Sequence, residues 1–210
     1  MTLLHALDYL GTVAFAVSGA LMAVRKRMDI FGIAVLAAVT AIGGGTVRDA
    51  LLDVPVFWLQ DSAYVLCALG SALVVFLLHK RIVGTALVAP HGGGQRLDAL
   101  RCFDAVGLGV FTAIGAMKAE AAHTGLVGIV TMACITGVGG GMIRDVLARE
   151  IPFVLREQVY ASACIVGAFA YWGMLQTTLG QTGAICVAAG LTTALRLAAV
   201  VLGWRLPKAS

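Results

Sequence analysis

The chain has 210 residues, of which 60% are hydrophobic and only 12% are charged, and its formal net charge is +4. Soluble domains carry about 25% charged residues, so this composition, with a mean hydropathy of +0.95, excludes an ordinary soluble protein. The apolar residues gather in runs of about 20, the length of a helix that crosses a bilayer, without the short alternating segments of a membrane β-barrel. The positive charge does not indicate nucleic-acid binding, because the basic residues lie in short loops between the apolar runs. We therefore expect an all-α integral membrane protein.

Seven apolar runs are predicted to span the membrane. In chain order they cover residues 3–24, 30–52, 62–78, 103–118, 125–147, 159–175 and 183–203. We expect one transmembrane domain over 1–210, in which 3–78 and 103–175 form two three-helix halves, 79–102 links them and 183–203 adds a seventh helix. The linker contains Ala89-Pro90-His91-Gly92-Gly93-Gly94, a sequence typical of a flexible loop.

The basic residues predict the orientation. Seven spans place only Arg48 and Lys118 on one side of the membrane. Twelve basic residues fall on the other side: Arg25, Lys26, Arg27, Lys80, Arg81, Arg96, Arg101, Arg144, Arg149, Arg156, Arg205 and Lys208. Because the cytoplasmic side carries the excess of lysine and arginine, we expect a multi-pass protein of the cell inner membrane, with its N-terminus outside and its C-terminus in the cytoplasm.

An internal repeat relates the two halves. Residues 7–54 align with residues 103–150 at a constant offset of 96, and 16 of the 48 positions are identical. The densest match pairs Gly43-Gly44-Gly45-Thr46-Val47-Arg48-Asp49 with Gly139-Gly140-Gly141-Met142-Ile143-Arg144-Asp145. The small alphabet of membrane helices explains scattered matches, but not the same GGGxxRD motif at the same place twice. Since each half has three spans, the second copy is predicted to be inverted, the usual architecture of transporters and some channels.

The two glycine triplets are the first candidate functional residues. Each glycine inside a helix costs about 1 kcal/mol relative to alanine, so each triplet costs about 3 kcal/mol. We expect a kinked or unwound helix at each triplet, whose freed carbonyl groups face an ion pathway rather than lipid. The expected pathway residues are Gly43, Gly44, Gly45, Gly139, Gly140, Gly141, Thr40 and Thr136. The alternative is close helix packing, the role we also expect for Gly11, Gly19, Gly107 and Gly115.

The arginine–aspartate pairs that follow the triplets are candidates for a gate or charge network. Adjacent residues on a helix diverge by about 100°, so we expect Arg48 and Arg144 to reach freed carbonyls or a carboxylate of the other half, rather than Asp49 and Asp145. A salt bridge that locks two helices is the alternative. Lys118, at the end of the fourth run, either faces an aqueous funnel or extends to the membrane interface.

Three further charges fall within or at the start of apolar runs. Asp8 and Asp104 are expected to begin the first helix of each half, where the helix dipole favours a negative charge. Arg196 lies within the seventh run and is expected to face a carboxylate, a lipid phosphate or a subunit interface.

The sequence contains no motif of an enzyme. It has no spaced metal ligands, activated nucleophile or phosphate-binding loop. The five cysteines are an odd number without metal-ligand spacing: Cys67, Cys102, Cys134, Cys164 and Cys186. We expect a protein that is not an enzyme and that has no cofactor or resident metal.

The chain resembles a known family over residues 3–203. A seven-helix chain of this length, with two inverted three-helix repeats and a glycine triplet in the second and fifth helices, resembles the trimeric intracellular cation channel family. The two GGGxxRD copies are similar to its prokaryotic branch. The resemblance implies a homotrimer surrounded by membrane lipids, without nucleic acid, in which each subunit has its own pore permeable to potassium or sodium ions. The glycine-broken second and fifth helices would line that pore.

Two points of function remain open at this stage. Animal members of the family bind phosphoinositide through a basic cluster after the first triplet, but residues 46–53 here are acidic on balance, so this regulation is not expected. A secondary transporter of a small zwitterion, such as an amino acid, is the alternative to the channel. It would use the amide and carbonyl ends of broken helices to bind a carboxylate and an ammonium group.

Overall fold

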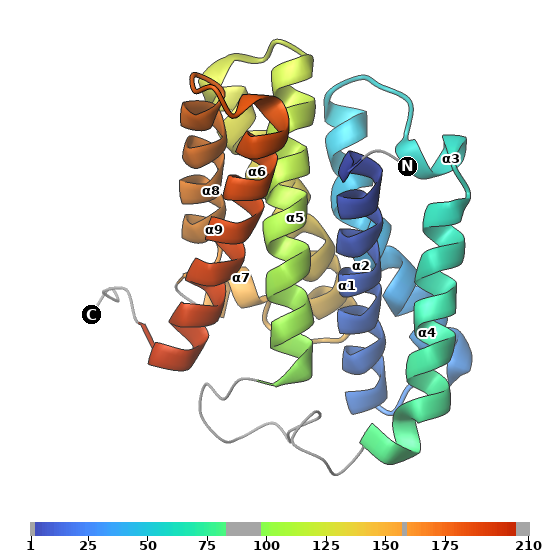
Figure 1. Cartoon of the computed structure of the whole chain (residues 1–210). Coiled ribbons are helices and arrows are strands. Elements are labelled where there is room, and N and C mark those ends of the chain that lie inside the picture. The colour runs from blue at the N-terminus through green and yellow to red at the C-terminus, as the bar shows by residue number, and fades with distance from the viewer. Residues whose placement is uncertain (1–2, 83–97, 157–158, 205–210) are drawn as a thin grey trace.

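The computed structural model describes residues 3–82, 98–156 and 159–204. Long helices stand side by side (Figure 1). The elements are α1 (Leu3–Arg25), α2 (Ile30–Leu51), α3 (Phe57–Gln60), α4 (Ala63–Ile82), α5 (Ala99–Ala121), α6 (Gly125–Leu147), α7 (Phe153–Arg156), α8 (Ala161–Met174) and α9 (Gly180–Leu202). At the upper end of Figure 1 begin the long helices α1, α4, α6 and α9, whereas α2, α5 and α8 begin at the lower end.

The predicted class of all-α membrane protein agrees with these helices. In the described part of the chain, six helices are long and apolar enough to cross a membrane: α1, α2, α4, α5, α6 and α9. The predicted run at 159–175 corresponds to α8, which is apolar but has only 14 residues. At 1.5 Å per residue such a helix rises about 21 Å, less than the hydrocarbon core of about 30 Å.

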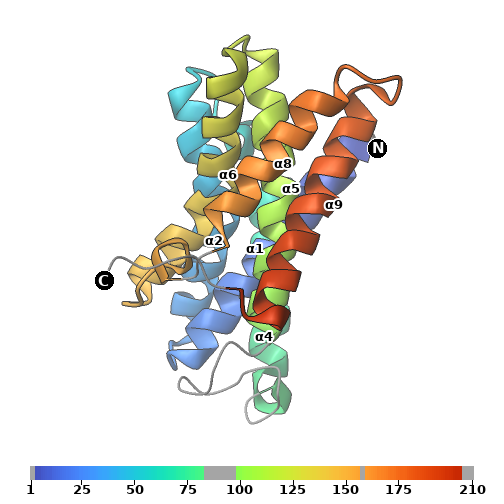
Figure 2. The ribbon, with the colours of Figure 1, turned by 90° about the vertical axis from the view of Figure 1, so that its left-hand side faces the viewer.

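Helix α5 lies at the centre of the bundle. It packs against α1 on one side and against α8 and α9 on the other, and α6 also contacts it along its length (Figures 1 and 2). Glycines allow this crowding: a Cβ atom added at Gly109 would lie 2.5 Å from the carbonyl oxygen of Ala189 in α9, and one at Gly115 would lie 2.6 Å from that of Met132 in α6. The close-packing role expected for Gly115 therefore holds.

Helix α5 begins four residues earlier than its apolar run predicts. Asp98 is its N-cap, and the carboxylate accepts a hydrogen bond of 2.9 Å from the backbone N–H of Arg101. The same carboxylate forms an ion pair of 2.8 Å with Arg25 at the end of α1. The apolar run alone does not predict where this helix begins, because the residue that caps a helix is polar. The predicted linker loop, with its Ala89–Gly94 segment, falls mostly outside the described residues.

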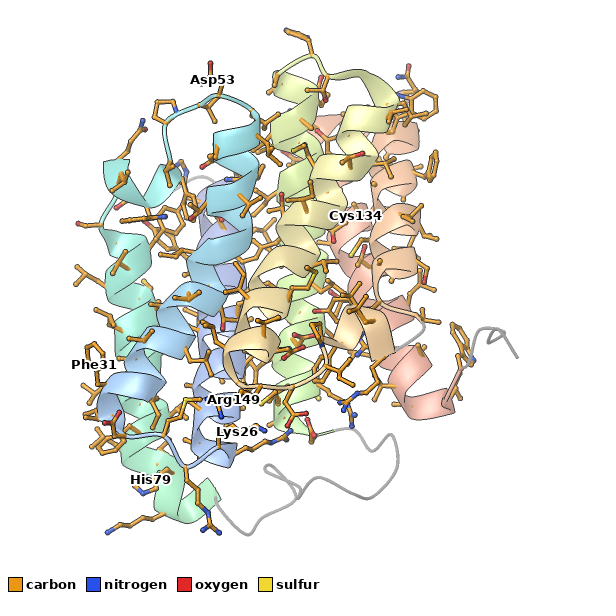
Figure 3. The ribbon with its side chains drawn as sticks, turned by 180° about the vertical axis from the view of Figure 1, so that it is seen from behind. Lys26, Phe31, Asp53, His79, Cys134 and Arg149 are labelled. Atoms are coloured by element: carbon orange, nitrogen blue, oxygen red, sulfur yellow. The ribbon has the colours of Figure 1, made fainter. Side chains whose placement is uncertain are left out.

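The offset of 96 residues recurs in the structure. The short helices α3 and α7 start at Phe57 and Phe153. Left-handed backbone conformations occur in equivalent turns, at Arg27 and His123 and again at Asp53 and Arg149. Figure 3 labels Asp53 at one end of the molecule and Arg149 at the opposite end. Equivalent turns of the two halves thus lie at opposite ends of the bundle.

Tyr9 anchors α1 to the segment between α3 and α4. Its hydroxyl donates a hydrogen bond of 2.6 Å to Asp61 Oδ2, and the other oxygen of this carboxylate accepts one of 3.0 Å from the N–H of Ala63. Tyr9 and Ala63, in that order, lower the pKa of Asp61 below its ordinary value of 3.8. The anchor therefore contributes stability above pH 3.8, and that contribution is lost as the pH falls through the lowered pKa.

We expect Tyr9→Phe to raise the pKa of Asp61 toward its ordinary value, so that acid-induced loss of stability begins at a higher pH. The measurement is the thermal melting temperature in detergent between about pH 3 and pH 7. Asp53→Asn, at an exposed carboxylate, is the matched control and should leave the acid response unchanged. An identical acid profile for wild type and Tyr9→Phe would contradict the prediction.

Candidate functional site

The glycine triplets lie where α2 and α6 cross. Both helices run without interruption through their triplets, so the predicted unwinding is wrong. A Cβ atom added at Gly44 would lie 2.3 Å from the carbonyl oxygen of Thr136, and one at Gly140 would lie 2.1 Å from that of Thr40. These two contacts are related by the offset of 96. Close approach of the two backbones offsets the low helix propensity of glycine, and the alternative of close packing is the correct one here.

The other triplet glycines also face neighbours rather than open space. A Cβ atom at Gly43 would lie 2.8 Å from the side chain of Ile143, and one at Gly139 would lie 3.0 Å from the Cα atom of Gly44. The third glycine of each triplet meets an aromatic residue: Gly45 faces the ring of Phe57 at 2.6 Å, and Gly141 faces a tyrosine hydroxyl discussed below.

Thr40 and Thr136 are both completely buried. Their hydroxyls donate to carbonyl oxygens of their own helices, Thr40 to Leu36 at 2.5 Å and Thr136 to Met132 at 2.6 Å. Their side chains pack against glycines of the preceding helix, Thr40 against Gly19. That these threonines line a pathway stays a prediction.

Each buried arginine bonds the aspartate next to it, contrary to the sequence-based expectation. Arg48 Nε lies 2.7 Å from Asp49 Oδ1, and Arg144 Nε lies 2.8 Å from Asp145 Oδ1. The 100° between neighbouring positions is no obstacle, because the arginine side chain is long enough to fold back around the helix. Each arginine is therefore partly neutralised within its own motif.

The second oxygen of each aspartate caps a short helix. Asp49 Oδ2 accepts a hydrogen bond of 3.0 Å from the N–H of Phe57, and Asp145 Oδ2 accepts one of 2.9 Å from the N–H of Phe153. These N–H groups open α3 and α7, where backbone donors have no partner within the helix. The motif GGGxxRD thus fixes the turn that follows it, as well as the crossing.

Arg144 is at the centre of a fully buried polar cluster toward the lower end. Its Nη1 atom lies 2.6 Å from Asp104 Oδ1 in α5 and 2.5 Å from Ser18 Oγ in α1. Arg144, Asp104 and Asp145 each have no exposed surface. Arg144 thus links α6 to a helix of its own half and to one of the other half. We call Asp104, Arg144, Asp145 and Tyr160 the lower cluster.

The equivalent residues toward the upper end are arranged differently. Asp8 accepts a hydrogen bond of 2.9 Å from the hydroxyl of Tyr64, and Arg48 stays with Asp49. Arg48 and Lys118, the latter in the last turn of α5, both act electrostatically on Asp8. We call Asp8, Arg48, Asp49 and Tyr64 the upper cluster. Three predicted charge-network residues, Arg48, Asp49 and Lys118, thus gather at one end.

Asp8 and Asp104 do not cap helices as expected. Neither α1 nor α5 has an acidic residue in its first turn, because α1 begins at Leu3 and α5 at Ala99, each five residues before its aspartate. The two carboxyl groups instead serve as partners of Tyr64 and Arg144. Each cluster therefore combines two carboxyl groups with one guanidinium, and a further cation lies nearby, Lys118 at the upper cluster and Arg196 at the lower one.

An aromatic pair fills the centre, midway along α1 and α5. The rings of Phe15 and Phe111 meet edge to face with centroids 5.2 Å apart, and both are buried. Each ring occupies the space beside a glycine of the other half: Phe15 lies against Gly107, and Phe111 against Gly11. The packing role expected for these glycines holds, and an aromatic contact lies between the two clusters.

The remaining intramembrane charge, Arg196, lies beside the lower cluster. Its Nη1 atom donates a hydrogen bond of 3.2 Å to the carbonyl oxygen of Val159, and the guanidinium carbon lies 4.8 Å from the centroid of the Tyr160 ring. A backbone carbonyl and an aromatic face thus both contact this guanidinium, and the expected carboxylate, lipid phosphate or subunit interface stays a prediction.

Several site residues were missed at the sequence level. The aligned repeat ends at residues 54 and 150, yet the same offset pairs Phe57 with Phe153 and Tyr64 with Tyr160. Extending the alignment by ten positions would have found all four. Ser18 left no such signal, because its equivalent is Ile114.

Comparison with known proteins agrees with this architecture. A family model described as glycine transporter matches residues 5–80 and again residues 101–176. The UPF0126 inner membrane protein YadS of Escherichia coli strain K12 is 42% identical over 209 residues, which cover 98% of this chain and 95% of the relative. A TRIC trimeric intracellular cation channel orthologue from Rhodobacter sphaeroides is 36% identical, with a TM-score of 0.85 over 97% of this chain and 100% of that one. A second TRIC cation channel structure is 33% identical, with a TM-score of 0.85 over 100% of this chain and 98% of that one. The chain therefore belongs to the prokaryotic branch of the trimeric intracellular cation channel family.

Proposed function

We propose that the protein is a potassium-permeable cation channel of the inner membrane, with a pathway inside each subunit. The pathway runs from the upper cluster, past the Phe15–Phe111 pair, to the lower cluster. One observation carries the proposal: each cluster holds two carboxyl groups and one arginine, and that arginine is bound to its neighbouring aspartate. The carboxylate outside the arginine–aspartate pair, Asp8 in one cluster and Asp104 in the other, is the group that attracts a permeating cation in this proposal. The solved relatives are cation channels.

The architecture behind this pathway is two inverted three-helix repeats. One repeat is α1, α2 and α4, the other is α5, α6 and α8, and α9 is the seventh helix. The opposite positions of Asp53 and Arg149 support the inversion (Figure 3), and the double match of one family model supports the duplication. Lys26 and Arg149 lie at the lower end, which supports a cytoplasmic location of that end and an N-terminus outside.

Side chains, rather than freed carbonyl groups, line the pathway in this proposal. Helices α2 and α6 contribute through the arginines that follow their triplets, Arg48 and Arg144. The glycines act by bringing the two helices together, so that both charged clusters converge on one axis. The Phe15–Phe111 pair forms a hydrophobic constriction, of the kind that blocks ions by excluding water. Three copies of the chain, each with its own pathway, form the channel.

A second candidate function is secondary transport of glycine. The description of the matching family model favours it, and a zwitterion would find both a carboxylate and a guanidinium in each cluster. The weakness of this alternative is that both arginines are already bound to aspartates, so a substrate carboxylate would have to displace one of them.

Two measurements on the same purified protein separate the candidates. In planar bilayers we expect discrete unitary currents whose reversal potential follows the potassium gradient. In proteoliposomes we expect no saturable uptake of radiolabelled glycine above that of empty liposomes. Saturable glycine uptake without unitary currents would replace the channel with the transporter. Native mass spectrometry in detergent should give the mass of three chains.

A further inference from the structure

Three arginines converge on one aromatic ring at the lower end of the molecule. The guanidinium carbons of Arg144, Arg156 and Arg101 lie 4.9, 5.6 and 5.9 Å from the centroid of the Phe153 ring. Phe153 itself is only 5% exposed. Arg144 ends α6 and is bound to two aspartates, whereas Arg101 lies in the first turn of α5 and Arg156 ends α7. Three helices therefore bring mutually repelling cations to the same ring.

The internal repeat shows that the fold of this turn does not require all three arginines. The equivalent ring in α3 has one guanidinium beside it in the described part of the chain, that of Arg48 at 5.7 Å. At the offset of 96, Arg101 corresponds to His5. Arg156 corresponds to Gln60, which is neutral. Helix α3 nevertheless forms with the same capping hydrogen bond as α7, so the two additional arginines have a role other than folding this turn.

The two additional arginines are placed to bind an anion. The structure gives Arg156 the Phe153 ring and no carboxylate of a described residue within ion-pair distance. Asp98 serves two arginines, with Oδ2 2.8 Å from Nη2 of Arg25 and 4.0 Å from Nη1 of Arg101. Arg156 is exposed, so its side chain can turn toward a ligand that Arg101 also reaches. Guanidinium groups bind phosphate oxygens in pairs, and the chemistry that fits is a phosphate group.

The surroundings of Arg156 fit a lipid rather than a free phosphate. Leu155 is 76% exposed and Ile151 is 62% exposed, so apolar side chains lie next to the cations. Helix α8, the next in the chain, is about 9 Å shorter than the hydrocarbon core. A bilayer accommodates a short helix by thinning beside it, which moves lipid phosphates toward the residues that precede α8.

We propose that Arg101 and Arg156, with the exposed apolar residues Ile151 and Leu155, bind an anionic phospholipid at the lower end. The two guanidinium groups contact the headgroup phosphate, and the apolar side chains contact the acyl chains. The guanidinium groups repel the ammonium group of a zwitterionic headgroup, so the surface selects an anionic one. This lipid site goes beyond the proposed channel function and does not depend on it.

Native mass spectrometry of the purified protein in detergent tests this surface. Phosphatidylglycerol and phosphatidylethanolamine with identical acyl chains are titrated separately, and the lipid adducts per chain give each dissociation constant. We expect phosphatidylglycerol to bind the wild type about fivefold more tightly than phosphatidylethanolamine. Arg156→Gln should weaken the binding of phosphatidylglycerol about fivefold, the contribution of one basic residue beside an anionic lipid.

Two matched controls separate a built site from diffuse attraction to a positive surface. Arg27→Gln removes an exposed arginine in the turn between α1 and α2, and should leave the affinity for phosphatidylglycerol unchanged. Leu155→Ser should weaken binding, whereas Leu59→Ser, at the equivalent leucine of α3, should not. Leu59 is also exposed, by 69%, so neither serine variant removes a buried side chain from the fold.

Three results would overturn the proposal. Equal affinity of the wild type for the two lipids would mean that the surface does not select an anionic headgroup. Equal losses of affinity in Arg27→Gln and Arg156→Gln would leave only diffuse attraction. Displacement of phosphatidylglycerol by inorganic phosphate would assign the arginines to a free anion, whereas we expect no displacement.

Discussion

Gly44→Ala combined with Gly140→Ala is expected to yield no folded protein. Each added Cβ atom would lie within 2.3 Å of a backbone carbonyl oxygen of the partner helix, and backbone cannot rotate aside as a flexible side chain can. We expect each single variant to lower the free energy of unfolding by about 3 kcal/mol, the upper range for overpacking. Because the two contacts share one crossing, their combined effect will not be a simple sum.

The chain offers a matched control for these variants. Gly70 in α4 and Gly190 in α9 are also helix-interior glycines, but an added Cβ atom would meet nothing within 4 Å. Gly70→Ala and Gly190→Ala should therefore leave stability unchanged or raise it by about 0.5–1 kcal/mol, because alanine favours the helix. The measurement is thermal unfolding in detergent. If Gly44→Ala melts at the same temperature as Gly70→Ala, the crossing is looser than described.

This experiment also distinguishes the two interpretations of the triplets that the sequence allowed. An unwound segment would accept alanine without loss of folding, and only conduction would change. A glycine run cannot distinguish these cases by itself, because both unwinding and close approach require the same missing side chain. The deciding fact is where the partner helix lies, and that follows from the packing of α2 against α6 rather than from either segment alone.

Composition and repetition predicted most of the fold. The apolar runs predicted each long helix, because a bilayer-length helix requires many apolar residues in succession. The errors lie at polar ends such as Asp98, where a capping carboxylate rather than an apolar residue decides the start. The offset of 96 would have predicted even the short helices at Phe57 and Phe153, had it been followed past residue 54.

The sequence indicated the charged residues of the candidate site but not their contacts. The GGGxxRD motif singled out Arg48, Asp49, Arg144 and Asp145, which the structure divides between the upper and the lower cluster. Which carboxylate each arginine reaches depends on side-chain conformation and on residues from other helices. Ser18 is the extreme case: a single serine in an apolar helix forms no pattern, and only its distance to Arg144 identifies it.

Arg144→Met is expected to be the most damaging single replacement in the charged clusters. It would leave Asp104 and Asp145 buried without their cation, and breaking a buried ion pair in this way costs about 3–5 kcal/mol. Arg48→Met should cost less, because Arg48 bonds one carboxylate where Arg144 bonds two. Both arginines are almost completely buried, so burial alone does not predict this order.

A compensating replacement isolates the cause. Arg144→Met with Asp104→Asn removes the cation together with the carboxylate that depends on it, and Asp145 keeps its hydrogen bond from the N–H of Phe153. Since an unpaired buried charge is what costs stability, the double variant should be more stable than Arg144→Met alone, as measured by unfolding in a denaturing detergent. If the stability losses of Arg144→Met and Asp104→Asn simply added in the double variant, Arg144 would stabilise the fold by its packing and not by its ion pair with Asp104.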